Sequence, residues 1–209
     1  MVVIKMTEKN NDKVIHKIKE ISERTAGIIT TKEVEEAGIC RGTLKKYVEQ
    51  GFLIRESKGI YSLAEEMPDE YAMLQKRSDK MIFSYGTALF LWGMSDRVPH
   101  SMSVSVPQGF NCTRIKKDNP KVVFHYVKKE LWEIGITTTK TSLGNTVLLY
   151  DKERCICDLV MIKKEIDKQL YIQAIREYFG GEYNARKIIK YSKQFGIEEK
   201  IRDYMDVLT

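Results

Sequence analysis

The hydrophobic residues between positions 14 and 21 recur at helical spacing and predict an amphipathic first helix. Its inward face is made of Val14, Ile15, Ile18 and Ile21. Asn11 or Asp12 is the expected N-terminal cap, and the helix is expected to end at Ala26-Gly27. This helix is predicted to support two shorter helices that follow it, so that the three close one core.

The segment 28–38 has the pattern of a short helix that begins with a capping box. Thr30 and Glu33 have the required spacing, at which the hydroxyl and the carboxylate each bond a backbone N–H group that the first turn leaves unpaired. Ile29 and Val34 occupy the two positions of a hydrophobic staple. Gly38 supplies the backbone freedom needed to leave the helix in a sharp turn. A short helix followed by a tight turn is therefore expected.

A second short helix is expected to begin near Arg41 and to stop at Gly51. Leu44, Tyr47 and Val48 share its inward face. The side chains left outside are those of Arg41, Lys45, Lys46 and Gln50. Residues 52–55 and 60–63 are typical of two short strands joined by a turn over residues 56–59. Helix, turn, helix and hairpin together predict a winged helix-turn-helix DNA-binding domain over residues 1–65.

In a domain of this kind the second helix of the motif enters the major groove, and the wing lies along the sugar–phosphate backbone. Arg41 and Thr43 are the candidates for base edges, because an arginine can bridge guanine O6 and N7. The candidates for phosphate contacts are Lys45, Lys46, Arg55 and Lys58. Thr31 and Tyr47 complete the predicted set of DNA-binding residues.

After a linker at residues 65–69 and a polar helix around residues 70–76, the pattern predicts a second domain over residues 70–209. The dense apolar run 82–94 is interpreted as a core helix with Ser84 as its cap and Gly93 as its stop. Apolar residues alternate with serines over residues 102–106, which predicts a strand, and residues 121–127 are predicted to form a second strand. Residues 133–141 and 146–150 resemble the two strands of a hairpin. This middle region is expected to be mostly β.

Asp151 is the expected cap of a helix that three more amphipathic segments follow. Breaks between those segments are expected at Gly180-Gly181 and at Gly196. The predicted fold class is therefore α+β: an N-terminal winged helix-turn-helix domain, then a mixed α/β C-terminal domain with terminal helices.

Composition changes this interpretation only modestly. The chain has 209 residues, a formal net charge of +6 and a pI near 9.0, which favour polyanionic partners. The positive excess is spread along the chain, so a DNA footprint must come from the placement of cations on one face.

The sequence gives little indication of a metal site or of a membrane-spanning segment. Cysteines 40, 112, 155 and 157 form no C-x2-C pair and the three histidines are scattered, so we expect free thiols, no metal site and no cofactor. The N-terminal apolar run is too short for a signal peptide, and no segment is apolar for the ~20 residues of a membrane span. A cytoplasmic location is expected.

Three later segments carry a family resemblance: YGTALFLWGMSDRVP at residues 85–99, VSVPQGFN at 104–111 and DKERCICDLV at 151–160. In this order behind a winged-helix front, they resemble the AbiEi antitoxins of bacterial type IV toxin-antitoxin systems, which serve abortive infection and phage defence. Cys40 departs from the Ser or Thr that often caps the recognition helix.

The resemblance implies a non-enzymatic transcriptional autorepressor that binds inverted repeats in double-stranded promoter DNA of its own operon. It also implies an antitoxin that counteracts a cognate nucleotidyltransferase toxin without a stable complex, with antitoxicity tied to the C-terminal domain.

Two other functions remain open from the sequence. A nuclease guided by the winged helix needs clustered carboxylates for its metal, and the candidates are Asp96, Asp118, Asp151 and Glu153. The other alternative is a winged helix used only to bind protein, because one fold hosts several functions.

Overall fold

The computed structural model describes residues 2–163 and 166–208, with side chains from Asn11 onward. The chain forms two compact units. The first comprises Met1–Lys76 together with Lys140–Asn145, and the second comprises Arg77–Thr139 and Thr146–Thr209. The first unit thus extends beyond residue 65, the predicted end of the N-terminal domain.

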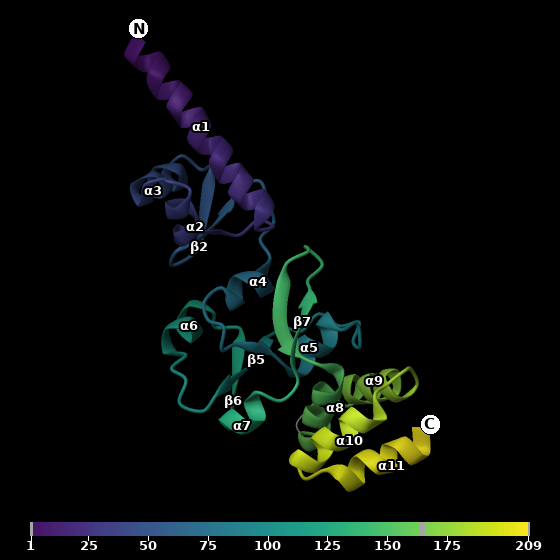
Figure 1. Cartoon of the computed structure of the whole chain (residues 1–209). Coiled ribbons are helices and arrows are strands. Elements are labelled where there is room, and N and C mark those ends of the chain that lie inside the picture. The colour runs from purple at the N-terminus through teal and green to yellow at the C-terminus, as the bar shows by residue number, and fades with distance from the viewer. Residues whose placement is uncertain (1, 164–165, 209) are drawn as a thin grey trace. The chain divides into compact units, whose positions relative to one another are not determined.

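The first unit contains a long helix, a helical pair and a small sheet (Figure 1). Its elements are α1 (Val2–Arg24), β1 (Ile29–Thr30), α2 (Thr31–Glu36), α3 (Arg41–Glu49), β2 (Leu53–Ser57), β3 (Ile60–Leu63) and α4 (Glu70–Gln75). The three-stranded sheet has the order β1-β3-β2, and β3 is antiparallel to both neighbours. The order of helices and strands along the chain is the one predicted for residues 28–63.

One core holds α1, α2, α3 and the sheet together. Ile18 and Ile21 of α1 meet the staple residues Ile29 and Val34, all of them buried. The capping box is also present, since Thr30 Oγ1 accepts from Glu33 N at 3.2 Å and Glu33 Oε2 accepts from Thr30 N at 2.9 Å. Burial of these aliphatic side chains is the main force that closes the unit.

The predicted start of α1 is wrong. The helix already begins at Val2, so Asn11 and Asp12 lie inside it. Asn11 does not cap a helix; its side-chain oxygen accepts a hydrogen bond from Tyr47 Oη at 2.8 Å. The Asn11 side chain, which the local sequence pattern predicts to be a helix cap, therefore makes a tertiary contact with α3 instead.

The second unit is built on a five-stranded sheet of order β6-β5-β4-β8-β7. The strands are β4 (Ile82–Phe83), β5 (Met102–Pro107), β6 (Val122–Val127), β7 (Ile136–Lys140) and β8 (Thr146–Tyr150). β4 is antiparallel to β5 and parallel to β8, and β5 is parallel to β6. The helices are α5 (Tyr85–Leu91), α6 (Thr113–Asp118), α7 (Lys129–Trp132), α8 (Lys152–Met161), α9 (Lys168–Phe179), α10 (Ala185–Gln194) and α11 (Glu198–Leu208). The predicted α+β class is confirmed.

The run 82–94 is not one helix. Ile82 and Phe83 form a central strand, Ser84 is extended, and α5 begins only at Tyr85. A fully buried central strand is as uniformly apolar as a buried helix, so the two cannot be distinguished by periodicity alone. The short helices α6 and α7 also lie outside the predicted elements.

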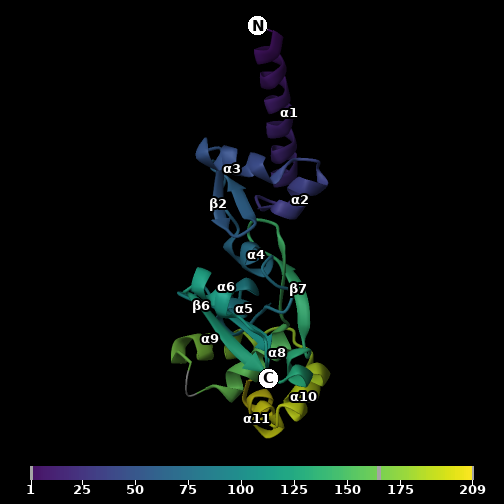
Figure 2. The same ribbon diagram turned by 90° about the vertical axis from the view of Figure 1, so that its left-hand side faces the viewer.

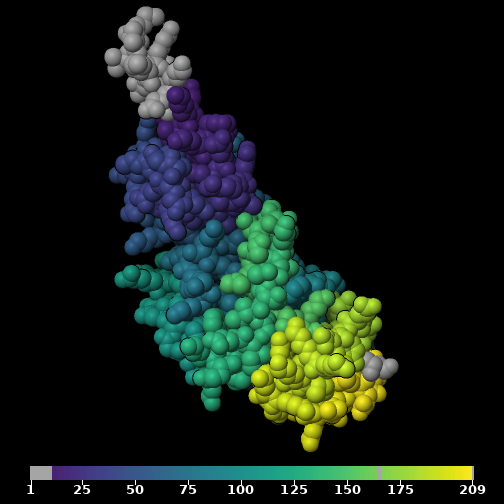
Figure 3. All heavy atoms as spheres, in the orientation of Figure 1, coloured from purple at the N-terminus to yellow at the C-terminus, as the bar shows by residue number. Residues whose placement is uncertain are grey.

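The C-terminal helices α9, α10 and α11 each contact α8 (Figure 2), and their atoms form the yellow end of the space-filling view (Figure 3). Asp151 caps α8 as predicted, accepting from Arg154 N at 2.8 Å. The breaks after α9 and α10 fall at the predicted glycines. No helix among the described residues is long and apolar enough to cross a membrane.

Candidate nucleic-acid interface

A tight turn sets the position of α3 relative to α2. Gly38 has φ +75°, its N–H donates to Glu35 O at 2.9 Å, and Ile39 N donates to Val34 O at 3.0 Å. A positive φ is easy for glycine and strained for other residues. Cys40 then occupies the N-cap position of α3 without a side-chain hydrogen bond, so this helix lacks the cap that a Ser or Thr would give.

The two faces of α3 differ as the sequence predicts. Leu44 and Tyr47 face the core, and Arg41, Lys45 and Lys46 are exposed. Tyr47 is only 1% exposed, with its ring against Phe52 and its hydroxyl bonded to Asn11. Burial raises the pKa of Tyr47. Tyr47 is therefore a core residue of the first unit, which differs from the surface position expected of a DNA contact.

Arg41 is paired with a residue that the prediction did not connect to it. Its Nε donates to one carboxylate oxygen of Glu35 on α2, and its Nη2 donates to the other at 3.0 Å. These hydrogen bonds from Arg41 lower the pKa of Glu35 and raise the pKa of Arg41. Both side chains are exposed, so the pair is in reach of a ligand that approaches α3.

This side-on pairing leaves half of the guanidinium available. An arginine carries N–H donors on Nε, Nη1 and Nη2 in a fixed plane. Glu35 binds the edge formed by Nε and Nη2, so the edge formed by Nη1 and Nη2 keeps donors that point away from the carboxylate. That edge has the geometry to bridge guanine O6 and N7.

The remaining candidates on α3 are less uniformly placed. Thr43 is half-buried in the first turn, and its N–H donates to Cys40 O at 2.9 Å.

Lys45, a candidate for a phosphate contact, lies 3.8 Å from Glu49 one turn further along α3. Lys46 bonds Asn11 Oδ1 at 3.4 Å and lies over the Tyr47 ring. Both lysines are exposed and can change partner at small cost.

The hairpin β2–β3 presents two further cations. Arg55 and Lys58 are exposed, and neither forms an ion pair with another described residue. Thr31 links the hairpin turn to α2, because its N–H donates to Gly59 O at 3.0 Å and its hydroxyl to the same oxygen at 3.4 Å. Thr31 thus holds the turn that carries Lys58.

The carboxylates proposed for a nuclease have other partners. Asp151 and Glu153 both bind Lys187, at 2.9 and 3.1 Å, and Asp118 binds Arg77 at 2.7 Å. Asp96 accepts from Gln173 at 3.1 Å. Over residues 2–163 and 166–208, no group of three or more His, Cys, Asp or Glu residues could hold a metal ion. The arrangement gives no support to metal-dependent cleavage.

Comparison with solved structures shows a likeness of fold. The RV2827C protein from Mycobacterium tuberculosis matches with a TM-score of 0.51 and 10% sequence identity, over 90% of this chain and 79% of that chain. No curated protein matches the sequence.

The family comparison bears on the first unit. Residues 16–64 run from the middle of α1 to the end of the hairpin and include α2 and α3. They match the model of a family described as a transcriptional regulator, AbiEi antitoxin, which confirms the resemblance to AbiEi antitoxins over these residues.

Proposed function

We propose that this protein is a DNA-binding transcriptional regulator and antitoxin of the AbiEi kind, without enzymatic activity, that acts in the cytoplasm. One observation carries the DNA-binding half. The residues that match the regulator family are those that present α3 and the hairpin, with exposed cations on both. Cations placed at those two points suit a winged helix-turn-helix, in which a helix enters the major groove while the wing follows the backbone.

On this proposal the N-terminal half of α3 reads the bases. Arg41 bridges guanine O6 and N7 through its Nη1–Nη2 edge while Glu35 holds the opposite edge. Thr43, also in the first turn of α3, contacts a neighbouring base edge. These contacts give sequence preference but only part of the affinity.

Cations around this site bind phosphates. Lys45 and Lys46 flank α3, and Arg55 and Lys58 lie on the hairpin. Each phosphate contact releases counterions, so the observed affinity falls as salt rises. Thr31 supports the hairpin turn and contributes to binding through that support.

The test is fluorescence anisotropy with the DNA immediately upstream of the gene, beside a shuffled duplex of the same length and composition, over a salt series. We expect preference for the upstream duplex and protection of inverted repeats there. Arg41→Ala should reduce this preference, whereas Lys32→Ala, an exposed residue of α2 paired with Glu36, should leave it unchanged. Equal affinity for both duplexes would refute sequence-specific regulation.

We further propose that the protein represses its own operon and counteracts a cognate nucleotidyltransferase toxin without a stable complex, through its second unit. The resemblance of residues 85–99, 104–111 and 151–160 to AbiEi antitoxins supports this assignment. The two genes should be adjacent. Supplied from an unlinked promoter, the protein should restore growth to cells that express the toxin, and Arg41→Ala should restore it equally well. No restoration by the wild-type protein would refute the antitoxin half.

A further inference from the structure

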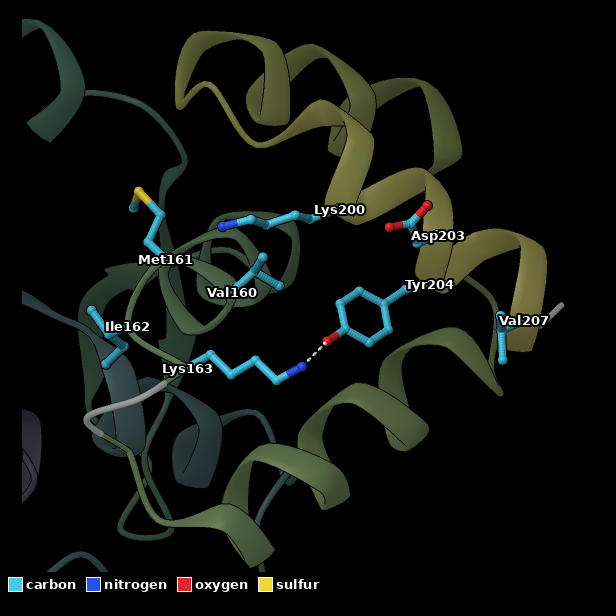
Figure 4. A pocket seen from close by; sticks show the side chains of 8 residues that line it. All are labelled: Val160, Met161, Ile162, Lys163, Lys200, Asp203, Tyr204 and Val207. Carbon is cyan, nitrogen blue, oxygen red and sulfur yellow. Dashed lines mark hydrogen bonds between the residues drawn. The ribbon is translucent and has the colours of Figure 1, made fainter.

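The second unit contains a pocket of about 520 Å³ that lies between the end of α8 and the helix α11 (Figure 4). It is lined by Val160, Met161, Ile162, Lys163, Lys200, Asp203, Tyr204 and Val207. A volume of this size is in the range of sites for small ligands. None of these residues belongs to the interface described above.

Two lysines supply positive charge to the pocket. Lys163 and Lys200 reach into it from α8's end and from α11, respectively (Figure 4). Among the described residues, neither lysine has a carboxylate within ion-pair distance. Lys163 Nζ instead donates to Tyr204 Oη at 3.0 Å and lies over the rings of Tyr171 and Tyr204. Such an ammonium group can still donate two hydrogen bonds, because it carries three N–H groups.

A tyrosine pair fixes the position of Lys163. The hydroxyl groups of Tyr171 and Tyr204 are 2.7 Å apart, and the ring of Tyr204 is stacked on Phe179. Burial raises the pKa of Tyr204, but the hydrogen bonds with Tyr171 and Lys163 and the positive charge of Lys163 outweigh it, so the net shift is downward. The pocket therefore favours negative charge at the Tyr204 end.

The other lining groups suit an organic ligand better than a bare anion. Val160 lies between the two lysine side chains, and the ring of Tyr204 lies beside the ammonium group of Lys163, so both offer apolar surface there (Figure 4). Asp203 lies on the same helix as Lys200 and can accept a hydrogen bond from a hydroxyl or amino group. Phosphate, sugar hydroxyls and a flat base together match this set of cations, acceptor and apolar surface.

We propose that the pocket between α8 and α11 is a binding site for a nucleoside phosphate. The phosphate binds Lys163 and Lys200, the base lies against Tyr204 and the aliphatic side chains, and Asp203 accepts from a hydroxyl or amino group. This site is separate from the DNA-binding residues and does not depend on the proposed regulation of transcription.

Isothermal titration calorimetry on the full-length protein tests the proposal, with the four ribonucleoside triphosphates, adenosine and tripolyphosphate as probes at one salt concentration. We expect saturable binding of at least one triphosphate and much weaker binding of adenosine and of tripolyphosphate. Lys163→Met and Lys200→Met should each weaken it roughly tenfold or more, because each removes a charge-assisted hydrogen bond. The matched control is Lys190→Met, an exposed lysine of α10 outside the pocket, which should change affinity by less than about twofold.

Three outcomes would overturn the proposal. The first is absence of binding by all four triphosphates. The second is equal weakening by Lys163→Met and Lys190→Met, which would show attraction to general surface charge. The third is tripolyphosphate binding as tightly as the best nucleotide, which would show a site for polyphosphate alone.

Discussion

At the scale of single residues, the pair of Glu35 and Arg41 determines how α3 would present an arginine to DNA in the proposed function. An exposed ion pair contributes little to folding stability, because water solvates both partners well. Its effect lies in the orientation of the arginine. A guanidinium held by a carboxylate on α2 loses less conformational freedom when it binds a base than one that moves freely.

Glu35→Gln should therefore reduce discrimination more than affinity. We expect the protein to discriminate less well between the operator and a variant with one guanine replaced, because Arg41 must then be ordered when it binds. Affinity for unrelated DNA should rise, since a negative charge near the phosphates is gone. Anisotropy on a set of single-base variants measures both effects.

Glu36→Gln is the matched control for this measurement. Glu36 is also an exposed acidic residue of α2, but its partner is Lys32, at 3.8 Å. Its removal should raise affinity for all sequences without loss of discrimination. If Glu35→Gln behaves in the same way, Glu35 acts only through its charge and does not orient Arg41.

Lys58 gives a second prediction at this scale. It is exposed at the hairpin turn and forms no ion pair with another described residue, so its removal breaks no ion pair among them. Lys58→Ala should weaken binding to all DNA sequences alike and flatten the dependence of log K on log salt by about one unit. An unchanged slope in the same titrations would mean that the hairpin does not contact phosphate.

At the scale of elements, helix caps and turns that depend on residues close in sequence could be predicted well. The capping box at Thr30, the turn at Gly38 and the cap at Asp151 depend on residues within a few positions, and all three are present. Long-range pairing could not be predicted in the same way. The strand at 82–83 exists because β5 and β8 lie on either side of it, and no local pattern encodes those partners.

The same distinction applies to the candidate site. The helical period of α3 predicts which side chains are exposed, so the sequence alone identifies Arg41, Lys45 and Lys46 as surface cations. The link from Glu35 to Arg41 crosses a turn, and its detection needs the angle between two helices. The burial of Tyr47 does not follow from its residue type, because an aromatic ring with a hydroxyl group suits either a core or a DNA-binding surface.

The capping box supplies a prediction for α2. Thr30→Ala removes the acceptor of Glu33 N, and the free energy of unfolding of the first unit should fall by about 1 kcal/mol. Amide hydrogen exchange in α2 measures this change locally. The two tryptophans, Trp92 and Trp132, both lie in the second unit, so their fluorescence transition serves as the control and should not move. Unchanged exchange in α2 would show that the box is dispensable.

At the scale of the whole molecule, the second unit is organised around a buried charge pair. Arg154 and Asp158 are each 2% exposed in their side chains and 2.8 Å apart. The guanidinium lies between the rings of Tyr150 and Phe195 and donates to two backbone carbonyls, Leu131 O and Ile134 O. It therefore joins the sheet, the α7 region and the C-terminal helices. Buried pairs of this kind seldom add net stability but are costly to break.

This pair makes the stability of the second unit depend on pH. Burial raises the pKa of Asp158 to about 6, although Arg154 opposes the shift, and Asp158 Oδ2 has no hydrogen-bond partner among the described residues. An unfolded aspartate has a pKa of about 3.9. The folded state thus binds the proton more tightly than the unfolded state, so this contribution to stability is complete below about pH 4 and is lost as pH rises through about 6.

Asp158→Asn separates this effect from all other titrations in the chain. Urea unfolding followed by tryptophan fluorescence reports the second unit, because Trp92 Nε1 donates to Tyr150 O and Trp132 Nε1 to Ser105 O within it. Between pH 4 and pH 7, the free energy of unfolding of the wild-type protein should fall relative to that of Asp158→Asn, which has no proton to lose at this position. A constant difference between the two proteins over that range would show that Asp158 is already ionised in the folded state at pH 4, held so by Arg154 despite its burial.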